Sequence, residues 1–159
     1  MFRLIRANIG DPDEAMDLTQ ETFVAGFGAL GRYDADRPFR IWIARIALNK
    51  CRDWARRRSV RSFFARALPL ESAHDVASDG PAPDAEAADR AELARVRAAM
   101  SRLAPNMREV LVLRGVEELS QAETAELLQT SEKTVETRLY RARAKLKALL
   151  GETAARGTG

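Results

Sequence analysis

Side chains able to bind duplex nucleic acid gather in residues 120–150. Lysine, arginine and hydroxyl groups bond to DNA phosphates, and several of them can also bond to base edges in the major groove. The residues that would face a groove from this segment are Thr134, Glu136, Thr137, Tyr140 and Arg141. The alternative is an ordinary helical hairpin whose charged face lies in water.

A second candidate binding group combines an aromatic ring with arginines. Trp42 lies beside the apolar stripe of a predicted helix that begins at Pro38, and arginines surround the same stripe. In such a setting an aromatic ring can stack on an unpaired base. Aromatic residues at helical spacing usually belong to a core, which is our expectation for Phe39, whereas both interpretations stay open for Trp42.

The sequence offers no pattern for catalysis or metal binding. Its one histidine, His74, lies in a polar stretch, and no cysteine and histidine pair has the spacing of metal ligands. No glycine-rich phosphate loop occurs either. We therefore expect a protein that is not an enzyme and that has no cofactor and no metal site.

Three features of the sequence bear on its compartment. The single cysteine, Cys51, excludes an internal disulfide and suits a reducing environment. No run of residues is long and apolar enough to span a bilayer, and residues 1–10 lack the apolar stretch and cleavage pattern of a secretion signal. We expect a cytoplasmic protein without membrane insertion.

Residues 120–150 are predicted to form two helices joined by a tight turn. Ser120 and Glu123 make a capping box, which places the start of the first helix near Gln121. Ser131 is the predicted N-cap of the second helix. The apolar stripe of that helix comprises Val135, Leu139, Ala142, Leu146 and Leu149.

The turn between these helices departs from an ideal helix-turn-helix. Gln129 stands where a glycine usually relieves a left-handed backbone, at a cost of up to about 1 kcal/mol relative to glycine. Ala125 and Val135 are suited to the point where the two helices cross, because a small residue allows close approach. The face expected to pack in the first helix is Ala122, Ala125 and Leu128.

The N-terminal part is predicted to form three helices. Residues 1–9 look like the last turns of a helix that Gly10 ends, and Pro12 opens a second helix whose early turns are acidic. One face of this second helix carries Met16, Phe23, Phe27 and Leu30. The third helix starts at Pro38, and its buried set is expected to be Phe39, Ile43, Ile46, Ala47 and Trp54.

Charge is distributed unevenly, although the formal net charge is only +3. Residues 45–66 contain eight basic side chains and one acid, whereas residues 71–89 contain six acids and neither lysine nor arginine. The second stretch also holds prolines and shows no helical period, so we expect a flexible linker there. The predicted fold class is all-α, with two small helical domains at 1–66 and 89–150, an acidic linker at 67–88 and a disordered tail at 151–159.

Two stretches together resemble the extracytoplasmic-function group of the sigma-70 family of bacterial RNA polymerase sigma factors. Residues 17–58 are similar to the family's second conserved domain, with an Asp-Leu-x-Gln-Glu-x-Phe helix and a Phe-Arg-x-Trp-x-x-Arg-Ile-Ala-x-Asn helix. Residues 103–146 are similar to its fourth domain and contain the Thr-Val-x-x-Arg-Leu-x-Arg-Ala-Arg signature. The family usually has a further helix before the position of Arg3, so the first domain is expected to be shortened at its N-terminus.

The resemblance implies three binding surfaces. Core RNA polymerase, through its β′ and β subunits, would bind a helix that presents Asp17, Leu18, Gln20 and Glu21. The single non-template strand of the promoter minus-ten element, with one base flipped from its stack, would bind Tyr33, Trp42, Arg45, Asn49, Arg52 and Arg56. The duplex minus-thirty-five element would be read by Arg114, Gln121, Lys133, Thr134, Glu136, Thr137, Tyr140 and Arg141.

The resemblance also implies an anti-sigma partner, so that the protein would be a monomer when free or a heterodimer with that partner. Glu136 departs from the family pattern, since its carboxylate could accept from cytosine N4 or could pair with Lys133 or Arg141. Two other hypotheses are a sigma mimic that binds an anti-sigma protein without DNA, and a stand-alone repressor. The basic residues of the last helix argue against the mimic, and the repressor leaves the polymerase-binding helix unexplained.

Overall fold

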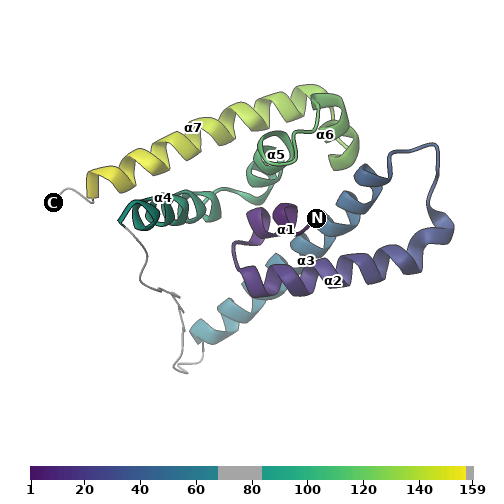
Figure 1. The fold of residues 1–159 in the computed structure, drawn as a ribbon, viewed down its shortest axis with the longest axis horizontal. Coiled ribbons are helices and arrows are strands. Elements are labelled where there is room, and N and C mark those ends of the chain that lie inside the picture. Colours follow the sequence, from purple (N-terminus) through teal and green to yellow (C-terminus); the bar gives the residue numbers. More distant parts are fainter. Residues whose placement is uncertain (68–83, 157–159) are drawn as a thin grey trace.

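Seven α-helices and one short 3-10 helix make up the part of the chain that the computed structural model describes, residues 1–67 and 84–156 (Figure 1). In chain order they are α1 (Phe2–Ile9), α2 (Pro12–Ala29), η1 (Leu30–Arg32), α3 (Phe39–Ala67), α4 (Asp84–Ser101), α5 (Pro105–Gly115), α6 (Gln121–Leu128) and α7 (Glu132–Arg156). No strand occurs among the described residues, and the predicted all-α class is confirmed.

The boundary between α1 and α2 is set by local sequence, as predicted. Gly10 has a φ of 87°, a left-handed conformation that suits glycine, and its amide donates to the carbonyl of Arg6. The Asp11 carboxylate then caps α2, because it accepts from the amides of Asp13 and Glu14 at 3.0 Å each. These contacts satisfy amides at the start of α2 and fix where the chain turns.

The face of α2 that packs is not the one that carries most of its large apolar residues. Its buried residues are Ala15, Leu18, Thr22 and Gly26. Met16, Phe23, Phe27 and Leu30 are all exposed. A Cβ atom at Gly26 would lie 2.7 Å from Cδ1 of Ile43, so a larger residue at this position would require the Ile43 side chain to move. Leu18 and the small residues therefore form the packed face of α2, and its other large apolar residues are exposed.

The core side of α3 is wider than predicted. Ile43, Ala47 and Trp54 are buried as expected, and the buried set also includes Ile41, Ala44, Leu48 and Cys51. The prediction for Phe39 is wrong, since this ring is about half exposed at the first turn of α3 and packs against Tyr33 and Trp42. Ile41 in the same turn is buried, so the exposure of Phe39 depends on the side of the helix that it occupies.

The two units predicted from the sequence share one hydrophobic cluster. It combines Leu4 and Ile5 of α1 and Leu48 of α3 with Val112 and Leu113 of α5. Helix α1 contacts α2, α3, α4 and α5, and Figure 1 shows it between the crossed pair α2 and α3 and the C-terminal helices. The short first helix thus buries apolar side chains against both units, which the sequence did not indicate.

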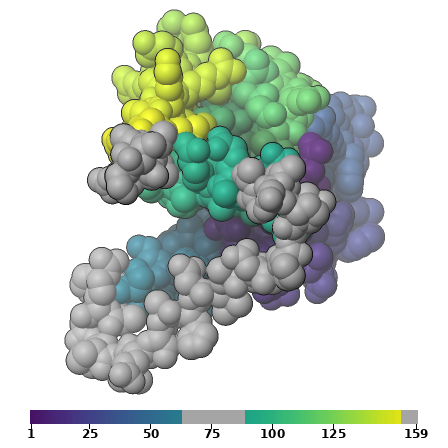
Figure 2. Space-filling view, turned by 60° about the vertical axis from the view of Figure 1, so that its left-hand side comes forward, coloured from purple at the N-terminus to yellow at the C-terminus, as the bar shows by residue number. Residues whose placement is uncertain are grey.

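The C-terminal helices form a second packed region. Ala99 of α4 and Leu149 of α7 are buried together with Leu103, and Figure 2 shows α4 and α7 side by side on the face turned to the viewer. Helix α4 begins at Asp84, earlier than the expected residue 89, and α7 continues to Arg156, beyond the expected 150. Alanine and glutamate near both ends have high helix propensity, which the domain boundaries did not take into account.

Most of the predicted acidic linker, residues 68–83, lies outside the described residues, as do residues 157–159 of the predicted tail. Among the helices that the structure does describe, none is both long and apolar enough to cross a membrane. The described part of the chain also holds no group of three or more His, Cys, Asp or Glu side chains that could bind a metal ion.

Candidate nucleic-acid interface

Helices α6 and α7 form the helix-turn-helix that the sequence predicts. The Ser120 hydroxyl accepts from the Glu123 amide at 3.1 Å, and the Ser120 amide donates to the Glu123 carboxylate at 2.7 Å. This is the predicted capping box, and α6 begins at Gln121 as expected. Hydrogen bonding to the side chain and backbone of Ser120 holds the pKa of the Glu123 carboxyl below its ordinary value.

The turn between α6 and α7 has the left-handed residue that the sequence predicts. Gln129 has φ 52° and ψ 51°, and the Thr130 amide donates to the Ala125 carbonyl at 2.9 Å. The Ser131 hydroxyl accepts from the Thr134 amide at 3.2 Å, which caps the start of α7. These bonds hold the angle between the two helices.

The packing of α6 differs from the predicted face. Ala125 is buried against Val110 of α5 and Val135 of α7, as the proposed crossing point requires. Ala122, however, is exposed, and the other buried residues of α6 are Thr124 and Leu127. The reason is that α6 packs against α3 as well as α7, and this second contact recruits a different side.

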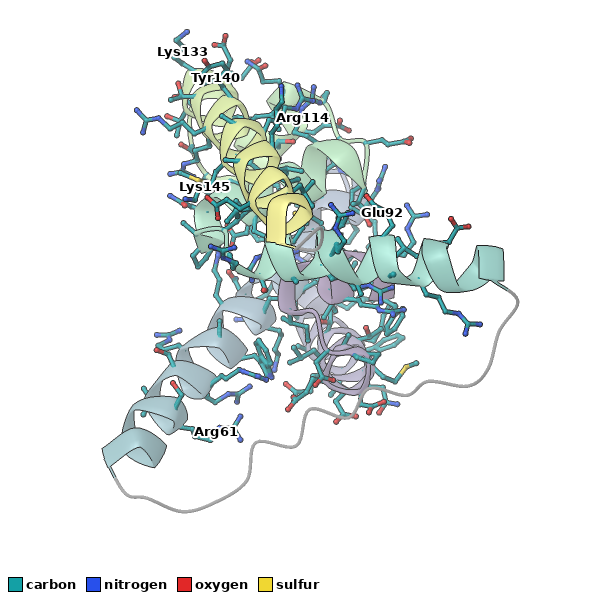
Figure 3. All side chains as sticks on the ribbon, turned by 90° about the vertical axis from the view of Figure 1, so that its left-hand side faces the viewer. Arg61, Glu92, Arg114, Lys133, Tyr140 and Lys145 are labelled. Carbon is teal, nitrogen blue, oxygen red and sulfur yellow. The ribbon has the colours of Figure 1, made fainter. Side chains whose placement is uncertain are left out.

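The exposed face at the start of α7 presents several of the residues predicted to read DNA. We call Lys133, Glu136, Thr137, Tyr140 and Arg141 the α7 surface. Figure 3 shows the labelled side chains of Lys133 and Tyr140 pointing away from the body of the molecule, and Tyr140 is 76% exposed. Charged residues of the α7 surface pair within the helix, since Nζ of Lys133 lies 2.9 Å from Oε2 of Glu136. In the free chain, Glu136 therefore adopts the intrahelical pairing that we considered beside a bond to cytosine.

Two of the residues predicted for the duplex element have bonds within the helix-turn-helix. The Arg114 guanidinium donates to the carbonyl of Leu119, and the side-chain amide of Gln121 donates to the carbonyl of Glu132 at 3.2 Å. Both side chains are half-buried and brace the connections before α6 and into α7. Their contact with DNA stays a prediction.

Three aromatic rings lie together at the start of α3. The ring centroid of Tyr33 is 5.0 Å from that of Trp42 and 5.5 Å from that of Phe39. The Tyr33 hydroxyl donates to the carbonyl of Arg37 at 2.6 Å, which fixes the ring. These rings adjoin a hollow of about 260 Å³, lined in part by Tyr33, Trp42 and Arg45. A cluster of rings beside arginines is a suitable platform for stacking unpaired bases.

The remaining residues predicted for the single strand follow along α3. We call Tyr33, Trp42, Arg45, Asn49, Arg52 and Arg56 the α3 surface. Asn49 is exposed, and its Oδ1 lies 3.4 Å from Nη1 of Arg52. Arg56 forms an ion pair with Asp53 of the same helix. The structure thus arranges these side chains along one stretch of α3 and the loop before it.

Residues of α5 and α6 contact the arginines of the α3 surface. Nε and Nη2 of Arg52 donate to the two carboxylate oxygens of Glu109 at 2.6 and 2.8 Å. This bond to Glu109 is the main cause that raises the pKa of Arg52. Nη2 of Arg45 donates to the Glu126 carbonyl at 3.0 Å. The sequence offered no sign of these contacts, because the partners are far apart along the chain.

The residues predicted to bind polymerase lie on α2, and they differ in exposure. Asp17 and Gln20 are exposed, whereas Leu18 is buried against the core. Glu21 is exposed, and its Oε2 accepts from Nζ of Lys50 at 3.1 Å. The exposed apolar residues of α2 lie among these acids, which gives one helix face of mixed apolar and acidic character. Phe23 and Phe27 were not among the predicted site residues, although their exposure makes them candidates for the same contact.

The single cysteine is a core residue that lies near Arg52 and Glu109. Cys51 is buried, and burial together with the nearby Glu109 charge raises the pKa of its thiol to about 12. A thiol with this pKa is protonated at neutral pH and a poor nucleophile. Cys51 is thus a small core residue, as the sequence predicts.

Family models match both parts of the chain. Residues 1–61 match the model described as sigma-70 region 2, and residues 93–146 match the model described as sigma-70, region 4. The RNA polymerase sigma factor CnrH of Cupriavidus metallidurans is 50% identical to this chain over 137 residues, which are 84% of this chain and 72% of CnrH. The RNA polymerase sigma factor NccH of Alcaligenes xylosoxydans xylosoxydans is 43% identical over 144 residues, which are 90% of this chain and 77% of NccH.

Solved structures of sigma factors have a similar fold. The structure of CnrH in complex with the cytosolic domain of CnrY has a TM-score of 0.68 and 36% sequence identity, and the match covers 95% of this chain and 80% of that one. The sigma factor RpoE in complex with the anti-sigma factor NepR from Bartonella quintana has a TM-score of 0.71 at 21% identity, covering 94% and 89%. The second likeness concerns the fold alone.

Proposed function

We propose that three separate surfaces of this chain bind the two promoter elements and core RNA polymerase. The chain belongs to the extracytoplasmic-function group of the sigma-70 family, and it directs promoter recognition and transcription initiation. Members of this family are DNA-binding regulators rather than enzymes. The observation that carries the proposal is that one chain holds two candidate DNA surfaces of different form. One is an aromatic cluster beside arginines, and the other is an exposed helix of a helix-turn-helix.

The α3 surface binds the unpaired non-template strand of the minus-ten element. Tyr33 and Trp42 supply rings on which bases stack, and Asn49 supplies an amide that can bond to a base edge. Unstacking a base costs a few kcal/mol, which stacking on protein rings and neutralisation of phosphates by Arg45 and Arg52 can offset. Strand opening is thus driven by binding energy, without hydrolysis of a nucleotide.

The α7 surface binds the duplex minus-thirty-five element. An exposed helix start with hydroxyl, aromatic and basic side chains suits entry into a major groove. Thr137 and Arg141 lie one turn apart, so they contact neighbouring positions along the groove. Arg114 and Gln121 support this arrangement from within the motif, since both bond to backbone carbonyls there.

The mixed apolar and acidic face of α2 binds core RNA polymerase. Asp17 and Gln20 present polar groups, and the exposed rings of Phe23 and Phe27 present apolar area that no described residue covers. Exposed apolar residues that lie together mark protein interaction sites more often than scattered ones do. A basic partner with an apolar centre, as the family implies for the β′ subunit, fits this face, and the chain works in the cytoplasm with the polymerase.

An anti-sigma protein is a further proposed partner. The support is that CnrH, a relative of 36% identity in the structural comparison, was solved in complex with the cytosolic domain of CnrY. The chain would then be a monomer when free and a heterodimer with this partner. Co-purification from the native cell, followed by mass spectrometry of a one-to-one complex, tests this partner.

Transcription with purified components tests the proposed function. Transcript starts are mapped after overproduction of the chain, and fragments with a shared pair of upstream motifs serve as templates. We expect run-off product only when the chain, core polymerase and an intact pair of motifs are all present. Product that is independent of the chain or of the motifs would contradict the proposal, and DNA retardation by the chain alone would favour a repressor.

A further inference from the structure

A cavity of about 560 Å³ lies where α1 meets α4, α5 and α7. Helix α1 contacts both α4 and α5, and Figure 1 shows it between the crossed pair α2 and α3 and the C-terminal helices. None of the described residues that line this cavity belongs to the α3 surface or the α7 surface. Its volume falls within the range of sites that hold small organic molecules. The cavity is therefore a candidate ligand site apart from the two DNA surfaces.

Most of the cavity wall is apolar. It includes the side chains of Ile9, Leu93, Val96, Met100, Leu111 and Leu146. Leu93 of α4 is 53% exposed, and the other five are half-buried. Part of their apolar area is left in contact with water, so a ligand that covers them removes this area from water. The wall favours a ligand with a hydrocarbon part.

Arginines are the only charged side chains that line the cavity within the described part of the chain. They are Arg3, Arg6, Arg97 and Arg108. None of these four arginines forms an ion pair with a described carboxylate. Four positive charges beside an apolar wall, without acids in the wall to balance them, favour a ligand that carries negative charge.

Two of these arginines are already bonded to the backbone. Nε and Nη1 of Arg108 donate to the carbonyls of Met100 and Asn8 at 2.9 and 2.6 Å, and its Nη2 donates to two more carbonyls. Nη2 of Arg3 donates to the Val116 carbonyl at 2.8 Å. These bonds hold Arg3 and Arg108 in place, so the two side chains supply the cavity with charge more than with free donors.

Arg6 of α1 and Arg97 of α4 remain available to a ligand. Nε of Arg6 is buried and has no hydrogen-bond partner among the described residues. Its guanidinium carbon lies 5.9 Å from the centroid of the Phe2 ring, and such a contact does not satisfy an N–H donor as an oxygen would. Arg97 is exposed, and its side chain has no hydrogen bond or ion pair within the described part of the chain. Since both side chains line the same cavity, one anion placed there can pair with both.

We propose that this cavity binds a free long-chain carboxylate, with its acyl chain along the apolar wall and its carboxylate group on Arg6 and Arg97. A guanidinium matches a carboxylate in geometry and pairs with it through two parallel hydrogen bonds. A small inorganic anion would leave the apolar wall uncovered, and a neutral lipid would leave the arginines unpaired. The bound molecule touches α1 on one side and α4, α5 and α7 on the other, so its binding stabilises the folded chain.

A first experiment measures binding to the full-length chain by isothermal titration calorimetry. The ligand is laurate, kept below the concentration at which it forms micelles. The comparison ligand is dodecyltrimethylammonium, which has an alkyl chain of similar length and the opposite charge. We expect one laurate to bind per chain, and the cation to bind about tenfold more weakly or not at all. Equal affinities would overturn the proposal. So would a failure of laurate to bind, which would leave the cavity to a helix of a partner protein.

The variant R6Q/R97Q tests the two assigned arginines. It removes two positive charges from the cavity, and R57Q/R61Q removes the same number from exposed positions of α3 outside the cavity. We expect R6Q/R97Q to bind laurate about tenfold more weakly than R57Q/R61Q, which should keep the wild-type affinity. Circular dichroism checks that each variant keeps its helices. Equal losses in both variants would show a general effect of charge and overturn the proposal.

A third experiment narrows the cavity without changing its charge. Gly115 lines the cavity, and a Cβ atom there would meet no atom within 4 Å, so Gly115→Leu can be accommodated. Gly151→Leu, at a position of α7 with the same free space outside the cavity, is the control. We expect laurate to raise the thermal unfolding midpoint of wild type and of the control, and to leave that of Gly115→Leu unchanged. An equal rise in all three would place the bound laurate elsewhere on the chain and overturn the proposal. The arginine variants keep the test if Gly115→Leu fails to fold.

Discussion

The α3 surface and the α7 surface carry similar residue types, yet their charged side chains have different partners in the free chain. On α7 the charged side chains pair with each other, as Lys133 does with Glu136, and Tyr140 lies in water. On α3, Arg52 pairs with Glu109 of another unit, whereas Arg56 pairs with Asp53 of its own helix. The difference shows that a basic groove-facing pattern does not by itself indicate an available surface. Availability depends on which acids the fold brings opposite. Within the described part of the chain, such an acid from a distant segment, Glu109, pairs with the α3 surface and none is seen at the α7 surface.

The largest expected effect concerns the shared cluster that holds the two surfaces in this arrangement. Leu113→Ala removes a fully buried side chain at the junction of α5 with α1 and α3, and we expect it to lower the free energy of unfolding by about 2 to 5 kcal/mol. Leu146→Ala, at a half-buried position of α7, serves as the control and should cost less. Urea denaturation measures both, and equal losses would show that the junction is not a packed core.

The next effect separates the two surfaces by the form of DNA that each binds. Trp42→Ala removes a stacking platform, so we expect binding of the minus-ten strand by the polymerase complex to weaken by about 1 to 3 kcal/mol. Tyr140→Ala should leave that strand unaffected and weaken binding of the upstream duplex instead. Permanganate reactivity of promoter thymines reports opening, and footprinting reports the duplex contact. A loss of both signals in either variant would contradict the assignment of the strand and the duplex to two separate surfaces.

Arg141 sharpens what the α7 surface does with duplex DNA. Arg141→Ala is expected to weaken upstream binding about tenfold. A phosphate contact would lower the affinity for all sequences and reduce its salt dependence, whereas a base contact would relax the preference at one position. Lys147→Ala, further along the same helix, provides a matched control. Affinity measured against single-base variants of the upstream element distinguishes the two roles. If neither the overall affinity nor the base preference changes, Arg141 does not contact the DNA.

The smallest expected effect concerns the capping box of Ser120 and Glu123 at the start of α6. A carboxyl whose pKa is lower in the folded than in the unfolded chain stabilises the fold above its unfolded pKa, and this stabilisation is lost as the pH falls through the folded value. Glu123 is such a group, because its bonds to Ser120 lower its pKa. We expect wild type to lose stability more steeply than Glu123→Gln between about pH 5 and pH 3. Urea midpoints across this range measure the slope, and identical slopes would contradict the prediction.

Local features of this fold could be predicted from the sequence because their causes lie within a few residues. The capping box at Ser120 and Glu123, the left-handed turn at Gln129 and the break at Gly10 depend only on neighbouring backbone groups. The resemblance to a family then supplied candidate surfaces and their division between strand and duplex, which the residue pattern alone had left open.

The rest depends on contacts between distant segments. Nothing near Arg52 in the sequence indicates that Glu109, 57 residues away, accepts two bonds from it. The same holds for α2, where periodicity grouped the large apolar residues correctly but could not tell whether that face packs or meets a partner. Gly26 shows the same limit, because a glycine within a helix can mark a close crossing, and only the structure shows that Ile43 of α3 lies against it.

The central claim is that the α3 surface binds the unpaired strand of the minus-ten element when the chain is bound to core polymerase. The most direct measurement is the anisotropy of a labelled oligonucleotide that carries the non-template minus-ten strand, titrated with the free chain and with the chain bound to core polymerase. We expect strong binding only with the polymerase complex, while the free chain leaves the anisotropy unchanged at the same concentrations. An unchanged anisotropy with the polymerase complex would contradict the claim, because the α3 surface would then not bind the strand.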